Sequence, residues 1–171
     1  MNSEVKVIAD PRLELDENGY AEAQKMLDEI DILVNEIHSS INRFRNAKKQ
    51  IVGWNELLKD FDESDTLLNL GNSIIKRMDH WESGLIQVKH ETFQDVVNFE
   101  SKLSAHLSFL KGIVDSHDPE ITQGARIRYE ELKKQWAESK EIMSEIIGQD
   151  FERYNALFKS KAIPALIFDS E

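Results

Sequence analysis

The sequence predicts an all-α protein: an antiparallel up-down-up-down four-helix bundle with long first and fourth helices and a short extended N-terminal arm. Apolar residues recur at alternating spacings of three and four over most of the chain, which places them on one stripe of each helix. The polar connections between these stretches are short, which favours antiparallel neighbours around one core. The 171 residues fit a single bundle, because domains usually contain ~100–200 residues.

The start of the chain differs from the rest. Residues 5–8 are rich in β-branched side chains, and Pro11 disfavours helix in the residue before it. The Asn18-Gly19 pair then supplies turn chemistry. We therefore assign residues 1–18 to an extended arm or a remnant strand of a preceding domain. Residues 19–171 are assigned to the four-helix bundle with an apolar C-terminal tail.

The first helix has the strongest pattern, which begins at Tyr20 and is predicted to run to about residue 60. Ile51 resumes the stripe after a polar interruption at Lys48, and the pattern continues past Gly53. The apolar positions are Tyr20, Ala23, Leu27, Ile30, Val34, Ile37, Ile41 and Phe44, then Ile51, Trp54, Leu58 and Phe61.

Two further helices are predicted in the middle of the chain. Ser64 can cap the second helix, and Thr92 can cap the third after a polar turn at residues 87–91. The third is expected to end near Gly112. The second carries Leu67, Leu70, Ile74, Met78, Trp81 and Leu85. The third carries Phe93, Val96, Phe99, Leu103, Leu107, Leu110 and Val114.

The fourth helix is predicted to follow a loop at residues 116–119, to begin near Thr122 and to span ~40 residues. At ~1.5 Å per residue the two long helices extend beyond the middle pair, so we expect a rod. Pro164 keeps the apolar tail Ile163–Phe168 out of the helix; we expect it to pack against a bundle end, with a short strand as the alternative. The stripe comprises Ala125, Tyr129, Leu132, Trp136, Met143, Ile146, Phe151, Tyr154 and Leu157, with polar Ser139 and Asp150 in phase.

Composition excludes several classes of function. The net charge of −11 opposes binding to nucleic acid or to an acidic lipid surface. The absence of cysteine excludes disulfides, thiolate zinc sites and a cysteine nucleophile. No stretch approaches ~18 consecutive apolar residues, so no membrane span is predicted, and the first residues do not have the pattern of a secretory signal.

No motif predicts catalysis, a cofactor or a metal, so we expect no enzyme. A di-metal bundle needs a carboxylate three residues before a histidine, and none precedes His38, His80, His90, His106 or His117. The acidic stretch Asp60–Asp65 lacks the glycine and the final glutamate of a calcium loop, and no Gly-x-Ser-x-Gly elbow surrounds Ser73. No facing carboxylate pair of the glycosidase kind can be recognised.

The three tryptophans are predicted to have different roles. Trp81 and Trp136 fall on apolar stripes, where an indole anchors packing. Trp54 lies between Gly53 and Asn55, near a possible bend, so it is the candidate for contact with a partner.

Several segments resemble a known family. They are Val5-Lys6-Val7 with Asp10-Pro11-Arg12, Trp81-Glu82, Leu85-Ile86-Gln87, Thr92–Phe99, Lys102-Leu103, Asp118-Pro119, Thr122–Ala125, Asn155-Ala156-Leu157 and Ile163-Pro164-Ala165. Together they resemble the C-terminal helical region of large bacterial BNR-repeat propeller proteins, sialidase-like or sortilin-like and often labelled glycosyl hydrolases. The resemblance implies an extracellular or periplasmic setting. It also implies a preceding propeller or β-sandwich domain as partner, with residues 5–8 as the last strand of that domain.

Two functional hypotheses follow. The first is a non-catalytic C-terminal accessory module of a larger secreted propeller-type protein that serves as a spacer or a protein-interaction surface, with a homodimer as one use of the overhanging stripes. The alternative is a carbohydrate-binding or glycoside-hydrolase-associated module with a cleft between helices or around Trp54.

Overall fold

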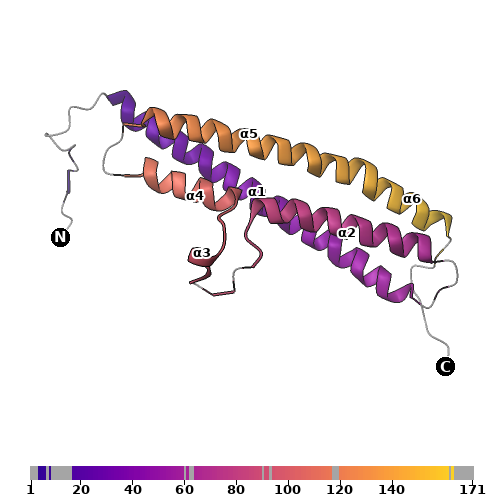
Figure 1. Ribbon diagram of the computed structural model, residues 1–171. Coiled ribbons are helices and arrows are strands. Elements are labelled where there is room, and N and C mark those ends of the chain that lie inside the picture. Colours follow the sequence, from indigo (N-terminus) through magenta and orange to yellow (C-terminus); the bar gives the residue numbers. More distant parts are fainter. Residues whose placement is uncertain are drawn as a thin grey trace.

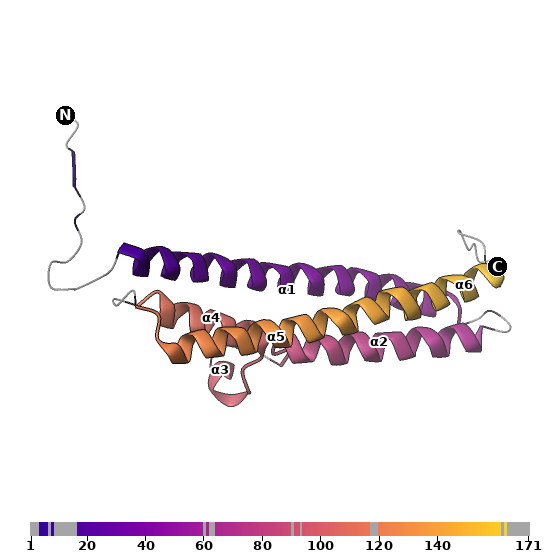
Figure 2. The ribbon, with the colours of Figure 1, turned by 90° about the horizontal axis from the view of Figure 1, so that it is seen from above.

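The protein is an elongated bundle of helices in a computed structural model that describes residues 4–6, 8, 17–59, 61, 64–89, 91–92, 94–116, 120–161 and 163 (Figures 1 and 2). No strand occurs among these residues, so the predicted all-α class is confirmed. The predicted arm covers residues 1–18; its described residues 4–6 and 8 have no regular secondary structure, whereas Glu17 and Asn18 already belong to the first helix. Of the predicted apolar tail, only Ile163 is described, where it packs against the core, and the placement of residues 164–168 lies outside the described residues. The elements are α1 Glu17–Leu57, α2 Asp65–Leu85, α3 Asp95–Asn98, α4 Leu103–Val114, α5 Gln123–Glu145, the π-helical η1 Ile146–Phe151 and α6 Glu152–Ser160.

Helix α1 is a single helix of 41 residues, close to the predicted extent. Its apolar stripe is needed for this length, because a helix gains most of its stability from packing of that face. Tyr20, at the start, remains 45% exposed. Gly53 does not interrupt the helix. The buried stripe consists of Ala23, Met26, Ile30, Ile37, Ile41, Phe44, Ile51 and Leu58.

The predicted caps have different outcomes. The hydroxyl of Thr122 accepts a hydrogen bond from the backbone N–H of Ala125 at 3.1 Å, as expected of the residue that precedes α5. Ser64 does precede α2, but its side chain makes no capping hydrogen bond. The side chain that organises the start of α3 is Asp95, which accepts hydrogen bonds from the backbone N–H groups of Glu91 and Thr92 at 2.8 and 2.7 Å.

The predicted third helix is not continuous. Helix α3 has four residues, and Phe99 after it is extended, with φ −124° and ψ 145°. The long helix of this segment begins only at Leu103. The hydrogen bonds that Asp95 accepts hold the turn before α3, and the extended backbone at Phe99 and Lys102 separates α3 from α4.

Helices α2 and α4 both run antiparallel to α1 and lie end to end along it (Figure 1). Lys111 Nζ of α4 lies 2.7 Å from Asp31 Oδ1 and Oδ2, and Ser104 lies opposite His38 further along α1. Residue numbers rise along α1 while those of the facing α4 residues fall, so the two helices are antiparallel.

The same alignment continues in α2. Its Glu82 pairs with Arg45, and its Asp79 pairs with Lys48 further along α1. Glu82 lies opposite Arg45, and His38 is seven residues before Arg45 on α1. If α2 continued as a regular helix past Leu85, the residue opposite His38 would be Lys89, seven residues after Glu82. The residue opposite His38 is Ser104 instead, which comes fifteen positions after Lys89 in the sequence.

The buried positions confirm that α2 and α4 form one interrupted helical segment. Shifted back by these fifteen positions, the buried apolar residues of α4 fall at 88, 92, 95 and 99. These numbers continue the spacing of four and three residues among the buried positions of α2 without a break. The residues are Leu67, Gly71, Ile74, Met78, Trp81 and Leu85 in α2, then Leu103, Leu107, Leu110 and Val114 in α4.

Helix α5 runs parallel to α1. The Tyr129 hydroxyl donates a hydrogen bond to Glu29 at 2.8 Å, and the Trp136 indole N–H donates one to Glu36 at 2.9 Å. The bundle therefore consists of three helical segments side by side. They are α1, the collinear pair α2 and α4, and α5 with η1 and α6 (Figure 2). The predicted up-down-up-down order of four helices is corrected to this arrangement. Helix α4 continues in the direction of α2, and its apolar face is in phase with that of α2, so it covers the half of α1 that α2 leaves open.

The last helical segment includes a π-helical turn. Between Ile146 and Phe151 the spacing is five residues, one more than an α-helical stripe requires. A π turn takes up the extra residue, so Ile146 and Tyr154 are both buried. The apolar faces before and after η1 thereby stay on the same side of the rod.

Candidate functional site

An open groove lies at the end of the rod where α1 and α6 run side by side. We call it the aromatic groove; its volume is about 330 Å³. Each helical segment lines it with side chains at spacings of three, one and three residues, which lie on one face of a helix. The lining residues are Ala47, Gln50, Ile51 and Trp54 of α1 and Phe151, Tyr154, Asn155 and Phe158 of η1 and α6.

A row of aromatic rings in contact with one another forms the wall of the groove. The Trp54 and Phe158 rings meet edge to face, with centroids 4.5 Å apart and planes at 69°. Tyr154 lies next to Phe158, with a centroid distance of 6.3 Å. Phe151 continues the row into the core, where its ring lies 5.9 Å from that of Phe44. Such pairs add ~0.5–1.5 kcal/mol beyond the burial of their area, so this wall is well ordered.

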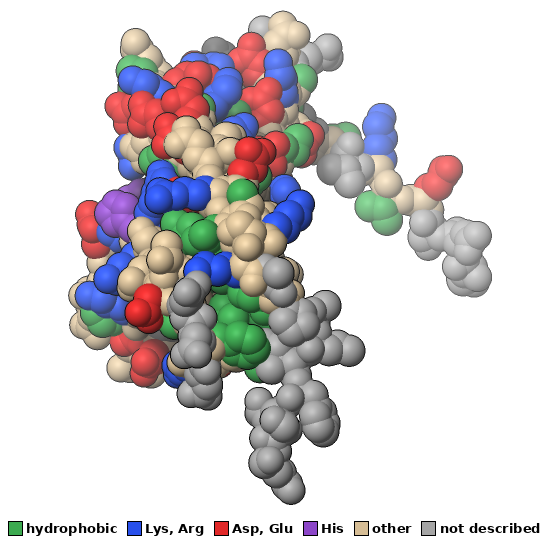
Figure 3. All heavy atoms as spheres, turned by 90° about the vertical axis from the view of Figure 1, so that its right-hand side faces the viewer, with side chains coloured by type: hydrophobic (Ala, Val, Ile, Leu, Met, Phe, Trp, Pro, Cys, Tyr) green, Lys and Arg blue, Asp and Glu red, His purple; other side chains and the backbone are tan. Residues whose placement is uncertain are grey.

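The groove lies between two helical segments that touch through aromatic side chains while their backbones stay apart. Among the described residues no Cα of α1 lies within 8 Å of a Cα of η1 or α6. Helix α2 packs against α1 and also against both η1 and α6, and so forms the support beneath. Figure 3 views this end of the rod and shows hydrophobic side chains gathered at the surface.

Among the described residues that line the groove, Tyr154 is the only titratable one. It is 6% exposed, and its hydroxyl has no hydrogen-bond partner in the part of the chain that the structure describes. This burial raises the pKa of Tyr154 above its usual value. The phenol is therefore protonated at neutral pH and is unsuited to act as a base.

Trp54, the residue singled out as a candidate partner contact, does line the groove. It is partly buried, on a continuous part of α1 and not at a bend. Trp81 and Trp136 are buried at 5% and 1% exposure, as predicted for packing anchors. Phe158 was not identified from the sequence. Its spacing from Phe151 and Tyr154 matches that of Trp54 from Ala47 and Gln50, and this was the available signal.

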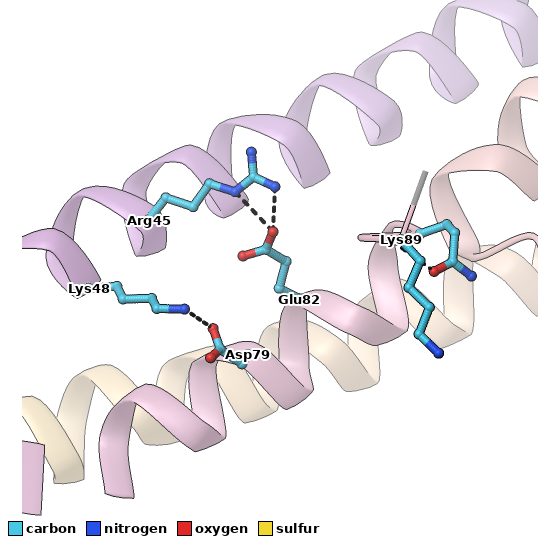
Figure 4. A network of polar contacts seen from close by, with 6 residues as sticks. Arg45, Lys48, Asp79, Glu82 and Lys89 are labelled. Atoms are coloured by element: carbon cyan, nitrogen blue, oxygen red, sulfur yellow. Dashed lines mark hydrogen bonds and ion pairs between the residues drawn. The ribbon is translucent and has the colours of Figure 1, made fainter. Parts of the chain in front are cut away.

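A second, wider depression lies between the outer faces of α1 and α2 (Figure 4). The guanidinium of Arg45 and the ammonium of Lys48 bridge it to Glu82 and Asp79 of α2. Lys89 extends over the ring of Phe99, 5.9 Å from its centroid. Exposed ion pairs contribute ~0–1 kcal/mol each. These groups align α1 with α2 and are already paired, so we assign this surface to the fold.

Three histidines, His38, His80 and His106, lie in the described part of the chain. The ring Nε2 of His38 is 2.9 Å from the hydroxyl of Ser104, His80 is exposed and His106 is half-buried. His90, His117 and residues 60, 62 and 63 of the acidic stretch Asp60–Asp65 fall outside the described residues. Within the described ranges, no three His, Asp or Glu side chains gather in a way that could hold a metal ion.

Comparisons with known proteins leave the family open, because no family model, curated protein or solved structure matches the chain. The resemblance to BNR-repeat propeller proteins therefore stays a prediction, and so do the secreted setting and the partner domain. In the described part of the chain, no helix combines the length and apolar character needed to cross a bilayer.

Proposed function

We propose that this protein is a non-catalytic helical module that acts as a spacer and presents the aromatic groove as a protein-interaction surface. The observation that carries the proposal is the position of Trp54: a large aromatic side chain, backed by Phe158, at an open groove at one end of a rigid rod. Aromatic residues of this kind dominate the binding energy of protein interfaces.

The rod itself supports the spacer role. Buried residues follow one another along the whole bundle from Ala23 to Leu58 on α1, so no gap in the core separates the two ends. Side-chain hydrogen bonds at Tyr129 and Trp136 attach α5 to α1 in register. An internally tied bundle keeps a fixed distance between the groups attached to its ends.

The chemistry of the groove supports binding in preference to catalysis. Six of the eight described lining side chains are hydrocarbon or aromatic, and Tyr154 stays protonated at neutral pH. A general base must be able to give up its proton near the working pH. The natural occupant of such a groove is an apolar segment of a polypeptide.

The spacer role is tested by distance measurement. The native chain has no cysteine, so spin labels can be attached to cysteines introduced at exposed Gln24 and Glu152. We expect one narrow distance distribution between the labels. A broad distribution contradicts the spacer role.

The interaction role is tested with the apolar dye ANS and by light scattering over a range of concentrations. Both are applied to the full chain and to a chain that stops at Ile163, and Trp54→Ala is the comparison. We expect dye binding or self-association in at least one of the two chains, and its reduction by Trp54→Ala. No binding and a strict monomer in both chains contradict the role of the groove.

One observation favours the alternative, a carbohydrate-binding module. Gln50 and Asn155 are exposed at the rim of the groove, next to Trp54, and an amide beside an aromatic ring suits a sugar. Titration with a panel of oligosaccharides, followed by tryptophan fluorescence, decides between the two. Saturable quenching that Trp54→Ala abolishes favours the sugar.

A further inference from the structure

The aromatic groove leaves room for one more helix at this end of the rod. Arg45 and Lys48 reach α2 from one side of α1, whereas the groove residues Gln50 and Trp54 lie on the other side. Helix α2 packs against α1, η1 and α6 and supports all three. A helix seated in the groove therefore contacts α1 and α6 without displacing α2, and it completes a cross-section of four helices.

The described lining of the groove belongs to helices throughout. Helices α1, η1 and α6 use their peptide groups for hydrogen bonds within each helix, so the groove meets an occupant with side chains. An extended segment would leave its own N–H and C=O groups unpaired against the aromatic wall. An α-helix pairs these groups internally and presents an apolar stripe. The occupant that fits is therefore an amphipathic helix.

A single cation lies in line with the groove on α1. Arg43 comes one heptad before Gln50 and four residues before Ala47, so it lies on the groove side of α1, beyond the Phe151 end. It is exposed and has no ion-pair partner in the described part of the chain. The eight described lining residues include no Asp or Glu that could neutralise it.

The exposed charges on the opposite rim cancel each other. Glu152 and Lys159 of α6 are one heptad apart on the side of Asn155, and they carry opposite charges. Arg43 therefore gives the groove a surplus positive charge in a protein whose net charge is −11. A carboxylate on the occupant complements this charge, and an ammonium group opposes it.

The spacing along α1 sets the pattern of the occupant. Arg43 and Trp54 are eleven residues apart, which is about three turns and a rise of ~16 Å. In a helix that lies along the groove, the apolar side chain at Trp54 and the carboxylate at Arg43 thus lie about three turns apart on one face.

We infer that the aromatic groove binds an amphipathic α-helix of a partner protein. Its apolar stripe packs against Trp54 and Phe158, and a carboxylate about three turns away on the same face pairs with Arg43. The inference rests on the proposed function, because it names the kind of segment that the interaction surface binds.

The test applies two synthetic helical peptides of about five turns each to the full chain. Both carry the same leucine stripe, and the residues in line with it at both ends are Glu in the acidic peptide and Lys in the basic peptide. Fluorescence anisotropy gives the Kd at ~0.15 M salt, where remote charges are screened over ~8 Å. We expect the acidic peptide to bind about two- to tenfold more tightly than the basic one.

Arg43→Glu should reverse the order of the two peptides. The matched control is Arg153→Glu, an equal change of charge at an exposed position on the opposite side of α6 from Asn155, and it should preserve the order. Tighter binding of the basic peptide to the native chain, or the same effect from both substitutions, overturns the inference.

Two further measurements test the helix and the anchor. A proline in the middle of the acidic peptide should weaken its binding by about tenfold or more, because it breaks the helix. Trp54→Ala should weaken both original peptides by about tenfold or more, with circular dichroism as the check that the variant folds. Equal binding of the proline peptide contradicts a helical occupant, and unchanged binding to Trp54→Ala contradicts binding in the groove.

The dye and light-scattering measurements separate this inference from the proposed function. ANS binding that Trp54→Ala reduces, with no peptide binding or equal binding of both peptides, contradicts the inference and leaves the groove as an interaction surface. Self-association that Trp54→Ala removes, without peptide binding, assigns the groove to a second copy of this chain and also contradicts the inference. Absence of dye binding, self-association and peptide binding contradicts the proposed function itself.

Discussion

The ring of His38 on α1 lies 2.9 Å from the hydroxyl of Ser104 on α4, at the position that a continued α2 would give to Lys89. Helices α2 and α4 thus form one helical segment with a continuous buried face, which we call the seam, and an insertion that contains α3 interrupts it (Figure 1). The offset of fifteen residues preserves both the antiparallel alignment with α1 and the helical phase.

Deletion of residues 88–102 is expected to join α2 and α4 into one helix. Leu103 then takes position 88, and the buried seam continues in phase. We expect the shortened protein to fold, with a higher helical fraction by circular dichroism and a Tm no lower than that of the full chain.

The matched control deletes only residues 88–100, which leaves two extra residues. Two residues rotate a helix by ~200°, so Leu103 and Leu107 would face away from the core. This variant should lose several kcal/mol of stability, by ~2–5 kcal/mol for each large apolar side chain removed from the core. Equal stability of the two deletions contradicts the continuous-seam description.

Gly71 of α2 is expected to be intolerant of alanine. A Cβ there would lie 2.7 Å from Asn55 Oδ1 and 3.0 Å from Ile51 Cγ2, and Asn55 is itself held by a hydrogen bond to Asn72. Gly71→Ala should therefore lower the free energy of unfolding by ~1–3 kcal/mol in urea titration. Gly53→Ala, with nothing within 4 Å, should raise it by ~0.5–1 kcal/mol. A stabilising Gly71→Ala would show that α1 and α2 are less closely packed.

The hydrogen bond from Tyr129 to Glu29 predicts a dependence of stability on alkaline pH. Burial first, and then Glu29, raises the pKa of Tyr129 above the usual value near 10. The contribution is fully present below pH ~10, and it is lost as the pH rises toward the higher pKa of the folded state, because the unfolded tyrosine ionises first.

Tyr129→Phe should therefore cost ~1 kcal/mol at pH 8 and reduce the loss of stability above pH ~10. Urea unfolding followed by circular dichroism from pH 8 to 11 measures both effects. Tyr20→Phe, at a side chain 45% exposed, is the control. An identical alkaline slope in Tyr129→Phe and the native chain would contradict the role assigned to this hydroxyl.

Deletion of Gly148 should convert η1 into regular α-helix. The five-residue spacing from Ile146 to Phe151 then becomes four, and Gly148 is exposed, with nothing within 4 Å of a Cβ placed there. We expect a change in stability within ~1 kcal/mol. Deletion of exposed Glu138 in α5 rotates all later residues by ~100° and should cost several kcal/mol. Equal damage from the two deletions would exclude a π turn that absorbs one residue.

Periodicity was sufficient to predict the long helices and most of the core, but not the break between α3 and α4. Ile30, Ile74, Leu107 and Trp136 lie on predicted stripes and are at most 1% exposed. The stripes have this power because an amphipathic helix has only one face that can leave water. The sequence also identified Trp54 as the candidate for contact with a partner. It did not identify Phe158, the aromatic residue that Trp54 contacts.

The sequence by itself determined where the long helices lie and which face of each is apolar, since both depend on spacing within one segment. Only the tertiary structure decided that α2 and α4 share one seam, that α5 is parallel to α1, and that a groove opens beside Trp54. These features depend on contacts between segments distant in the chain, such as Tyr129 with Glu29, and stripes of equal period are compatible with several such pairings. The pairing that is observed buries most positions of the stripes together, and leaves Tyr20 and Phe61 exposed at the two ends of the first stripe.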